Sequence, residues 1–250
     1  PSLGYVARGK YAYSRDRLLI ADNSGKLLDA DGGSWLVTGL YDDGDLQRYR
    51  IEVCFGKYVG ARIGLFVVGE DYYYGREDEG FVVRGTWRQS VARVYIANNE
   101  GHLAHAVQNP NGSWMWVDEN GCNNRDQAID IVLSAAWSSL GIPYVWSGES
   151  PLDGGMDCSG LVYYCYKQLG IVLSRVTYDN MVGEGTEVSF GEARPGDLIF
   201  MYYSDRGPEH VVLYVGNGMV IEEPNFNMSC QYVSLASKHA SRIQIKRIIT

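Results

Sequence analysis

Long hydrophobic runs are missing from this chain of 250 residues. No apolar stretch approaches the roughly 18 residues that a membrane-spanning helix needs, so we predict no transmembrane segment. The chain begins Pro1-Ser2-Leu3 without a basic and apolar leader, as expected if a signal peptide has been removed.

Positive charge and histidine are also scarce. The 30 Asp and Glu residues against 22 Lys and Arg give a net charge of −8, and the basic residues are scattered. A nucleic-acid partner would need a basic stripe, and an anionic lipid surface attracts an acidic chain poorly, so neither partner is predicted. His102 and His105 are spaced H-x-x-H, but no cysteine or third ligand stands at a zinc-like spacing. We therefore predict no metal site and assign both histidines structural or surface roles.

The five cysteines, an odd number, provide no disulfide framework. They are Cys54, Cys122, Cys158, Cys165 and Cys230. Cys158 and Cys165 stand two turns apart on a predicted helix, about 10 Å, whereas bridged Cα atoms lie within about 7 Å. We interpret Cys165 as a small buried apolar residue. A bridge between Cys54 and Cys122 is left open, so cysteine usage does not settle the redox compartment.

Aromatic residues are abundant, with 19 tyrosines and 6 tryptophans. Four segments before residue 121 or ending there combine a strand, a polar turn with Gly and usually a return strand: 19–27, 72–87, 95–103 and 114–121. Such segments are typical of β-hairpins, so we predict a β-rich hairpin-repeat domain over residues 1–120. They resemble bacterial cell-wall-binding repeats, which would make this a wall-binding module. The alternative is an accessory domain whose aromatics only form its core.

Residues 121–250 have an α+β pattern, with helices first and strands afterwards. A stretch rich in Asn, Pro and Gly, 109–124, marks the boundary. A helix is predicted over 125–140, capped by Asn123 or Asn124 and stopped by Gly141. Its predicted apolar face consists of Ala128, Ile131, Val132, Ala135 and Ala136. After a polar segment, 174–193, antiparallel strands are predicted at 197–203, 210–215, 219–222 and 243–248.

A second helix is predicted to begin at Cys158, in the run Asp157-Cys158-Ser159-Gly160. Its buried face would contain Leu161, Val162, Cys165 and Leu169, and Gly170 would end it. In the first turn of a helix, unpaired N–H groups and the macrodipole favour a thiolate. Further along the chain, His210 opens an apolar strand and supplies an imidazole that can take the thiol proton. This pair predicts a nucleophile and its base.

Four motifs occur in the order found in one enzyme family: GIPYVWSG at 141–148, DCSGLV at 157–162, PGDLIF at 195–200 and HVVLYVG at 210–216. On these motifs, residues 125–250 resemble the NlpC family of papain-like cysteine peptidases, which are cell-wall endopeptidases. The resemblance implies a papain-like fold. The chain departs from the family pattern at Ser147, where Gly is usual, and in a longer loop, 149–156, before the nucleophile.

Carried over by position, the resemblance implies that Cys158 is the nucleophile. His210 would be the general base and later the acid for the leaving amine. The third, orienting position falls on Glu222, where the family often has His. A carboxylate there would hold the imidazole by a charge-assisted bond. The adjacent Glu223 competes for the same role.

Three further residues are implied to face the substrate. Tyr144 matches a family tyrosine near the nucleophile that helps bind the substrate or the developing oxyanion. Asp157 and Ser159 match positions that contact the stem peptide, although helix capping is an equal alternative for Asp157. The Cys158 backbone N–H is the other predicted oxyanion donor.

The triad also predicts the turn between two strands. If Gly216-Asn217-Gly218 forms a three-residue hairpin loop, Val212 lies opposite Glu222, and His210 is diagonal to Glu222 on the same face. A two-residue loop would pair Leu213 with Glu222 and turn the carboxylate to the other face. We therefore predict the longer loop.

Together these features predict a secreted bacterial cysteine endopeptidase of the cell wall, without a metal or organic cofactor. It would hydrolyse an amide in the peptidoglycan stem peptide through a thioester acyl-enzyme, by resemblance between γ-linked D-glutamate and the following diamino acid. Residues 1–120 would hold cell-wall glycan or polymer. Two alternatives stay open: a non-catalytic wall-binding protein that keeps a peptidase-like domain, and an amidase or acyltransferase on the same fold. Permuted relatives of the latter kind place the histidine before the cysteine, which disfavours that alternative.

Overall fold

The structure, a computed structural model, divides the chain into two compact units, Pro1–Trp87 with Tyr95–Leu103 and Arg88–Val94 with Ala104–Thr250. The residues described are 9–14, 17–21, 39–43, 46–52, 59–62, 64–68, 70–75, 83–89, 93–99, 101–175 and 181–250. These units are distinguished by how compactly their residues pack. That distinction does not test the domain boundary that the sequence predicts between residues 120 and 121, which stays a prediction.

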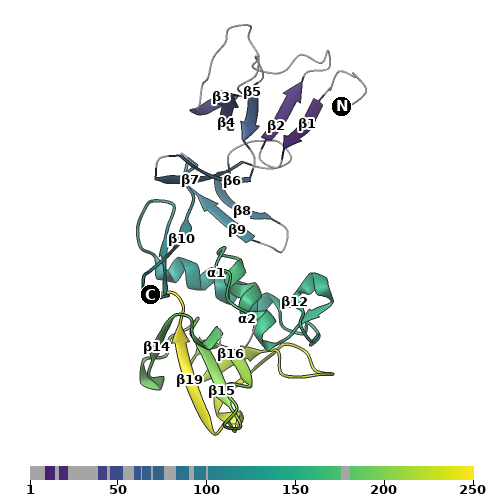
Figure 1. Cartoon of the computed structure of the whole chain (residues 1–250), viewed down its shortest axis with the longest axis vertical. Coiled ribbons are helices and arrows are strands. Elements are labelled where there is room, and N and C mark those ends of the chain that lie inside the picture. The colour runs from purple at the N-terminus through teal and green to yellow at the C-terminus, as the bar shows by residue number, and fades with distance from the viewer. Residues whose placement is uncertain are drawn as a thin grey trace. The chain divides into compact units, whose positions relative to one another are not determined.

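The first unit is built of strands (Figure 1). Five form one antiparallel sheet in the order β1-β2-β5-β4-β3: β1 (Gly9–Ser14), β2 (Arg17–Ala21), β3 (Gly39–Asp43), β4 (Leu46–Glu52) and β5 (Val59–Arg62). β6 (Gly64–Val68) pairs with β7 (Asp71–Gly75), and β8 (Gly85–Gln89) pairs with β9 (Arg93–Ala97). Of the last two strands, residues 85–87 and 95–97 belong to this unit. The prediction of a β-rich N-terminal region is confirmed.

An aromatic core holds the later strands of this unit together. Tyr74 of β7 stacks on Tyr95 of β9 with ring centroids 4.1 Å apart, and Trp87 lies against both rings. The same cluster contains buried Val83, Ala97 and Leu103. In these residues the aromatics form a core, as the accessory-domain alternative expects.

Two of the four predicted hairpins can be followed in the described residues. The segment 95–103 turns back as predicted, because the Asn98 N–H donates to the His102 carbonyl oxygen at 3.1 Å. The segment 114–121 also turns back as predicted: after β11 (Trp114–Val117) the Asp118 N–H donates to the Cys122 carbonyl oxygen at 2.8 Å, and Val117 and Asn123 form an antiparallel bridge. β11 pairs in addition with the preceding strand β10 (His105–Gln108). Residues 22–27 of the first segment and 76–82 of the second lie outside the described residues.

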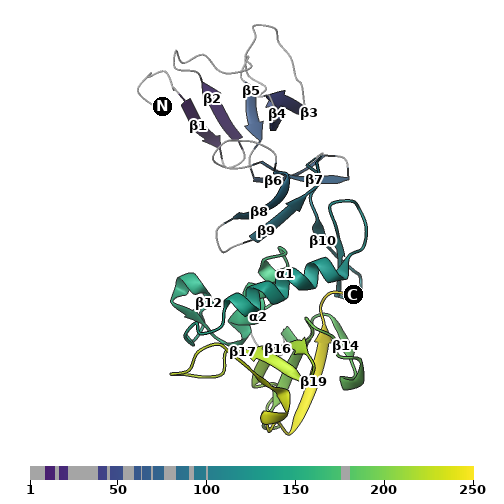
Figure 2. The same ribbon diagram turned by 180° about the vertical axis from the view of Figure 1, so that it is seen from behind.

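The second unit contains two α-helices and a six-stranded antiparallel sheet (Figure 2). The sheet order is β14 (Thr186–Val188), β19 (Arg242–Arg247), β15 (Leu198–Tyr202), β16 (His210–Gly216), β17 (Met219–Glu222) and β18 (Gln231–Ser234). The four predicted strands are present, and the α+β prediction is confirmed. The sequence did not predict β14 and β18, which are short and carry polar residues. No helix of the described part is long and apolar enough to cross a membrane.

Helix α1 (Arg125–Ser138) begins where the sequence predicts. The Asn124 side chain accepts the Gln127 backbone N–H at 3.1 Å, and Gly141 follows the helix with φ +83°. The buried face consists of Ala128, Ile129, Val132, Ala135 and Ala136. The prediction was wrong at Ile131, which is only partly buried. Ile129 lies closer than Ile131 to the helix face that the other four residues form, so Ile129 is buried instead.

Helix α2 (Cys158–Lys167) packs against α1 and β16. Its predicted face is confirmed, since Leu161, Val162, Cys165 and the following Leu169 are fully buried. Gly170 follows the helix with φ +78°, a conformation that glycine adopts without strain. Two short paired strands, β12 (Glu149–Ser150) and β13 (Gly155–Met156), shape the loop before the helix.

The hairpin of β10 and β11 pairs with the C-terminal end of this unit. Trp114 donates its backbone N–H to the Ile248 carbonyl oxygen at 2.7 Å and accepts the Thr250 N–H at 2.9 Å. Trp116, which is 2% exposed, donates from its indole to Gln127 of α1 at 2.6 Å. These contacts make the hairpin part of the core beside α1.

Candidate active site

Cys158 is the first residue of α2 and is 3% exposed, and its sulfur is in no disulfide. The helix begins there because Asp157 caps it. Asp157 Oδ1 accepts the Gly160 N–H at 2.6 Å and the Ser159 hydroxyl at 2.9 Å. The cap fixes the first turn, where N–H groups and the helix macrodipole favour a negative charge.

The second oxygen of Asp157 ties the cap to two neighbouring segments. Oδ2 accepts the Ser147 backbone N–H at 2.9 Å and Arg175 Nη2 at 2.8 Å. Arg175 also donates from Nη1 to the Gly148 carbonyl oxygen at 2.9 Å. Both carboxylate oxygens are therefore engaged within the protein, as the capping alternative expects. Substrate contact stays a prediction for Asp157 and for Ser159.

His210, the first residue of β16, lies between Cys158 and Glu222. Its Nε2 is 2.7 Å from Glu222 Oε2, and its side chain is also hydrogen-bonded to Cys158. Since the carboxylate engages Nε2, Nδ1 is the nitrogen left for the thiol. Burial lowers the pKa of His210, but the hydrogen bonds to Cys158 and Glu222 outweigh burial and raise the pKa from 6.5 to about 9. The imidazole therefore favours its protonated form at neutral pH.

Glu222, the last residue of β17, is fully buried and has three partners. Oε2 faces His210, whereas Oε1 accepts from Gln231 Nε2 at 2.7 Å and from Lys238 Nζ. Burial raises the pKa of this carboxyl, but the hydrogen bonds from His210, Lys238 and Gln231 bring the pKa down to about 2. Glu222 is therefore ionised at neutral pH.

Sequence reasoning missed Gln231 and Lys238. Gln231 lies directly opposite Glu222 on β18, a strand that the sequence does not predict. Lys238 follows a short 3-10 turn, Leu235–Ser237, and reaches the site only through the tertiary structure. One feature of the sequence could have indicated such partners. The imidazole of His210 can donate to only one oxygen of the Glu222 carboxylate, so a buried carboxylate at this position needs further donors for its second oxygen.

The turn between β16 and β17 corrects one prediction. Gly216 pairs with Met219, so the loop contains two residues, Asn217 and Gly218, and not three. Both loop residues have positive φ, at +53° and +71°. Positive φ at both central positions is the geometry of a type I′ hairpin, which matches the twist of the strands.

The register of this hairpin is nevertheless the predicted one. Leu213 pairs with Ile221, so Val212 lies opposite Glu222. A β-bulge immediately before Gly216 supplies the extra residue that a three-residue loop would have supplied. The bulge, and not the loop, thus keeps Glu222 on the face of His210.

Tyr144 lies beside this site, in the segment before β12. Burial, followed by the negative groups Cys158, Asp157 and Glu223, raises the pKa of its phenol to about 12. The hydroxyl therefore stays protonated at neutral pH and can donate a hydrogen bond. The structure brings Tyr144 into the same electrostatic environment as Cys158.

Glu223, the competitor of Glu222 in the sequence, has a different environment. It is fully buried, and neither carboxylate oxygen has a hydrogen-bond partner in the described part of the chain. Burial first, and then the charges of Asp157 and Glu222, raise its pKa to about 8. The group is therefore mainly a neutral acid at neutral pH, and it is Glu222 that bonds to His210.

The other cysteines differ from Cys158. Burial raises the pKa of Cys165, and it raises the pKa of Cys230 to about 12, so both thiols stay neutral. Cys122 is exposed and free, so it forms no bridge, and Cys54 lies outside the described residues.

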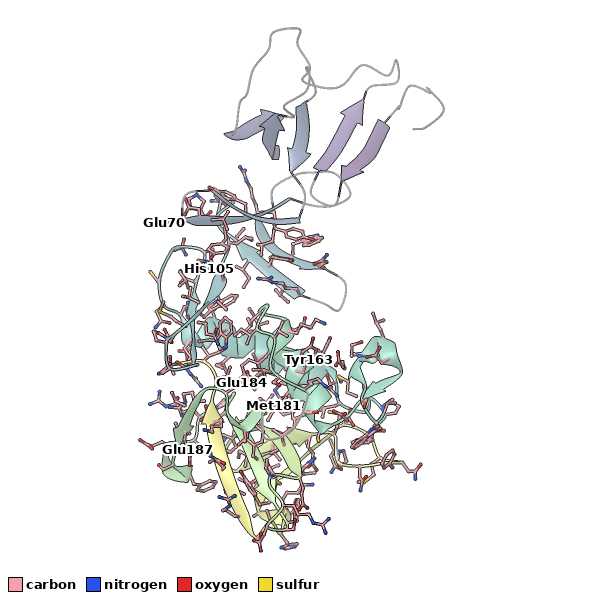
Figure 3. All side chains as sticks on the ribbon, viewed as in Figure 1. Glu70, His105, Tyr163, Met181, Glu184 and Glu187 are labelled. Carbon is pink, nitrogen blue, oxygen red and sulfur yellow. The ribbon has the colours of Figure 1, made fainter. Side chains whose placement is uncertain are left out.

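The two spaced histidines occupy separate places. His102 Nδ1 is 3.8 Å from Asp71 Oδ1 in the first unit. His105 belongs to the second unit, where it is the first residue of β10 (Figure 3). Within the ranges described, no group of three or more His, Cys, Asp or Glu side chains could hold a metal ion.

Comparison with known proteins points to one family. Residues 141–247 match the NlpC/P60 family. The chain is 31% identical over 156 residues to the murein DD-endopeptidase MepH of Escherichia coli (strain K12), covering 60% of this chain and 57% of MepH. It is 40% identical over 110 residues to the peptidoglycan endopeptidase RipB of Mycobacterium tuberculosis (strain CDC 1551 / Oshkosh), covering 40% of this chain and 44% of RipB.

A third relative is the gamma-D-glutamyl-L-lysine dipeptidyl-peptidase of Bacillus cereus (strain ATCC 10987 / NRS 248). It is 32% identical over 147 residues, which cover 55% of this chain and 43% of that protein. The chain thus spans about half the length of the curated relatives that it matches. The family match contains all four motifs on which the resemblance rests, from 141–148 to 210–216.

Proposed function

Residues 141–247 are a domain of the NlpC/P60 family, and on this premise we propose that the protein is a cysteine endopeptidase acting on peptidoglycan stem peptides. The observation that carries the proposal is the hydrogen-bonded series Cys158, His210 and Glu222. The relatives support the substrate class, because two of them are named for murein or peptidoglycan.

The first half-reaction forms an acyl-enzyme. His210, which favours its protonated form at neutral pH, holds the proton of the Cys158 thiol at Nδ1, and the thiolate sulfur attacks the carbonyl carbon of the scissile amide. The developing oxyanion accepts hydrogen bonds from the Cys158 backbone N–H and the Tyr144 hydroxyl. When the C–N bond breaks, His210 gives the proton to the leaving amine, and a thioester remains on Cys158.

The second half-reaction releases the acid product. Water attacks the thioester carbon while His210 accepts a proton from the water, and the C–S bond then breaks. His210 returns that proton to the sulfur. Glu222 stays ionised and holds Nε2 throughout, so the imidazole keeps Nδ1 toward the sulfur.

We assign the scissile bond to γ-linked D-glutamate and the following diamino acid. The name of the Bacillus cereus relative specifies a γ-D-glutamyl bond to L-lysine, which supports this assignment. The name of MepH specifies a DD-endopeptidase, so the competing assignment is a D-alanyl bond.

Residues 1–120 are proposed to hold cell-wall glycan or polymer, and the protein to act as a secreted, wall-associated enzyme. The support is the series of strand and turn segments in this region, together with a substrate that belongs to the cell wall. Sedimentation of the chain with purified walls, with and without residues 1–103, measures the contribution of this region.

Mass spectrometry of peptidoglycan fragments incubated with the wild type and with Cys158→Ala tests the activity. Fragments that end at D-glutamate, released by the wild type only, support both the activity and the bond. Fragments cleaved at a D-alanyl bond would still support the endopeptidase activity, but they would show that the competing bond is the one hydrolysed.

Two outcomes favour the alternatives. If neither protein releases a fragment while both sediment with the wall, the peptidase proposal fails and a non-catalytic wall-binding protein replaces it. If an added amine acceptor is acylated and no free acid forms, the chain is an acyltransferase on this fold.

A further inference from the structure

An exposed aromatic patch, consisting of Tyr144, Trp146 and Phe226, borders the candidate active site. Trp146 is 62% exposed and Phe226 is 59% exposed, although both side chains are large and apolar. Their rings lie at 21° to each other with centroids 6.2 Å apart. Phe226 also meets the Tyr144 ring edge-on at 5.2 Å. The patch therefore runs from the neighbourhood of the nucleophile out to solvent.

Backbone pairing fixes the two segments that carry these rings. Residues 141–144 run antiparallel to 228–230, through hydrogen bonds from Gly141 to Cys230 at 2.9 Å, from Cys230 to Ile142 at 2.8 Å and from Tyr144 to Met228 at 2.9 Å. A bond from the Met228 N–H to the Asn225 carbonyl oxygen, at 3.2 Å, closes the turn around Phe226. Both views show the loop after β17 and the region of β12 at the same end of this unit, opposite β14 (Figures 1 and 2). The rings thus form a preformed surface and not a set of independent side chains.

We propose that this aromatic patch binds a pyranose ring of the glycan strand from which the stem peptide extends. The inference rests on the proposed function and adds a sugar subsite to it. Exposed apolar patches beside a catalytic group mark ligand-binding surfaces. Since Tyr144 joins the patch to the environment of Cys158, the occupant is a part of the substrate that lies next to the scissile peptide.

The chemistry of peptidoglycan selects the sugar among the parts of that substrate. A pyranose ring presents a flat face of C–H groups that can cover an indole or a phenyl ring, while its hydroxyls stay hydrated at the rim. D-Glutamate and a diamino acid end in charged groups and offer no such face. The three side chains of the patch carry no formal charge at neutral pH, so the patch itself supplies no ion-pair partner.

The proposal predicts that the patch affects only substrates that carry the sugar. Two substrates are compared, a free stem peptide and the same peptide attached to its disaccharide. Trp146→Ala and Phe226→Ala are each expected to lower kcat/KM for the disaccharide-peptide about 3- to 10-fold, mainly through KM, because a ring contact is lost. The values for the free peptide are expected to stay unchanged.

Phe190→Ala is the matched control, because Phe190 is 57% exposed in the 3-10 turn Phe190–Glu192 that follows β14. It is expected to leave both substrates unaffected. Equal losses on the two substrates in the Trp146 and Phe226 variants, or no loss on either, would overturn the sugar subsite.

Calorimetry with Cys158→Ala measures binding of the same two ligands without turnover. Tighter binding of the disaccharide-peptide, lost when Trp146→Ala is added, is the expected result. Equal affinity for both ligands overturns the subsite, whether or not the wild type hydrolyses them. If the wild type cleaves neither ligand but Trp146 still governs sugar-dependent binding, the subsite stands and the proposed activity fails.

Discussion

At the scale of single residues, one buried carboxylate organises the candidate site. Glu222 bonds to His210 on one oxygen and to Gln231 and Lys238 on the other. A buried carboxylate without such partners would be costly to ionise. Lys238 therefore acts as a positioning residue, which holds Glu222 and, through it, His210.

Lys238→Met removes the ammonium group and keeps most of the side-chain volume. Glu222 then loses one of the hydrogen bonds that lower its pKa, so its folded-state pKa rises from about 2. The stability that this carboxylate contributes is fully present above pH 4.5 and is lost as the pH falls toward its folded pKa. We expect the variant to be less stable by about 1–3 kcal/mol at pH 7, as for a hydrogen bond to a charged group, and the difference to shrink below pH 4.5.

Thermal unfolding at pH 7 and at pH 3.5 measures this difference. Lys238→Arg keeps the charge and is expected to recover most of the stability. A loss that is the same at both pH values would mean that Lys238 contributes only packing.

Glu223 gives the opposite pH dependence. Its pKa is raised to about 8 in the folded protein, so the folded state binds the proton more tightly than the unfolded state. Stability therefore falls as the pH rises from about 4.5 to about 8 and levels off above that. Glu223→Gln removes the ionisation, and we expect it to match the wild type at pH 5 and to exceed it by about 2–4 kcal/mol at pH 9.

Chemical denaturation of both proteins at pH 5 and pH 9 measures that effect. Asp205→Asn changes an exposed carboxylate and is expected to show no comparable difference between the two pH values. If Glu223→Gln is no more stable than the wild type at pH 9, the carboxyl is hydrated or paired in solution, and its assigned environment is wrong.

At the scale of elements, the β16–β17 hairpin decides whether His210 and Glu222 face each other. Gly216 has φ +97°, and a Cβ there would stand 3.3 Å from Pro195 Cγ. Gly216→Ala is expected to destabilise the second unit by about 1–3 kcal/mol, the cost of forcing a side chain into this backbone conformation. A hairpin that escaped the strain by losing its bulge would shift register and turn Glu222 to the other face.

Activity and unfolding are measured together for this variant. Hydrolysis of peptidoglycan fragments is expected to fall even at temperatures where the variant remains folded. Asn217→Gly is the matched control, because it relieves a positive φ in the same turn and is expected to be neutral or slightly stabilising. Full activity in Gly216→Ala would show that the bulge is dispensable.

At the scale of the whole molecule, the β10–β11 hairpin precedes the predicted boundary at residues 120 and 121 but pairs with the C-terminus. Trp116 is almost fully buried and bonds to Gln127, and Trp114 pairs with Ile248 and Thr250. A chain that starts at residue 121 loses these contacts. We expect it to be less stable than a chain that starts at residue 104 by at least about 3 kcal/mol, the typical cost of removing a buried tryptophan side chain.

Thermal unfolding of the two truncated chains measures the difference. The longer one is also expected to hydrolyse soluble fragments, and to sediment less with walls if residues 1–103 hold them. Equal stability of the two chains would support the boundary at residue 120.

Many features of the second unit could be predicted from the sequence because they depend on neighbours in the chain. Asn124 and Asp157 cap their helices within three residues, and the buried face of α2 follows from helical spacing. Strands β15, β16 and β17 carry apolar runs, whereas β19 alternates Ile with polar residues. The starts of α2 and β16, and therefore the positions of Cys158 and His210, followed from the same local rules.

Other features depended on segments that meet only in the folded chain. Gln231 and Lys238 reach Glu222 from β18 and from the segment after Leu235–Ser237, and neither segment has a periodic apolar pattern. The predicted loop of three residues was replaced by a two-residue loop and a bulge, because two backbone solutions give the same register. Turn length alone therefore could not be deduced from the requirement that His210 and Glu222 meet.

The sequence by itself determined where the two helices of the second unit begin, four of the six strands of its sheet, and the two residues proposed as nucleophile and base. Each of these follows from propensities and periodicities that act over a few residues. The tertiary structure decided which groups surround Glu222, why Glu223 is buried with no hydrogen-bond partner among the described residues, and how the aromatic patch comes together. These depend on burial and on contacts between distant segments, whose free energies arise only when the chain has folded.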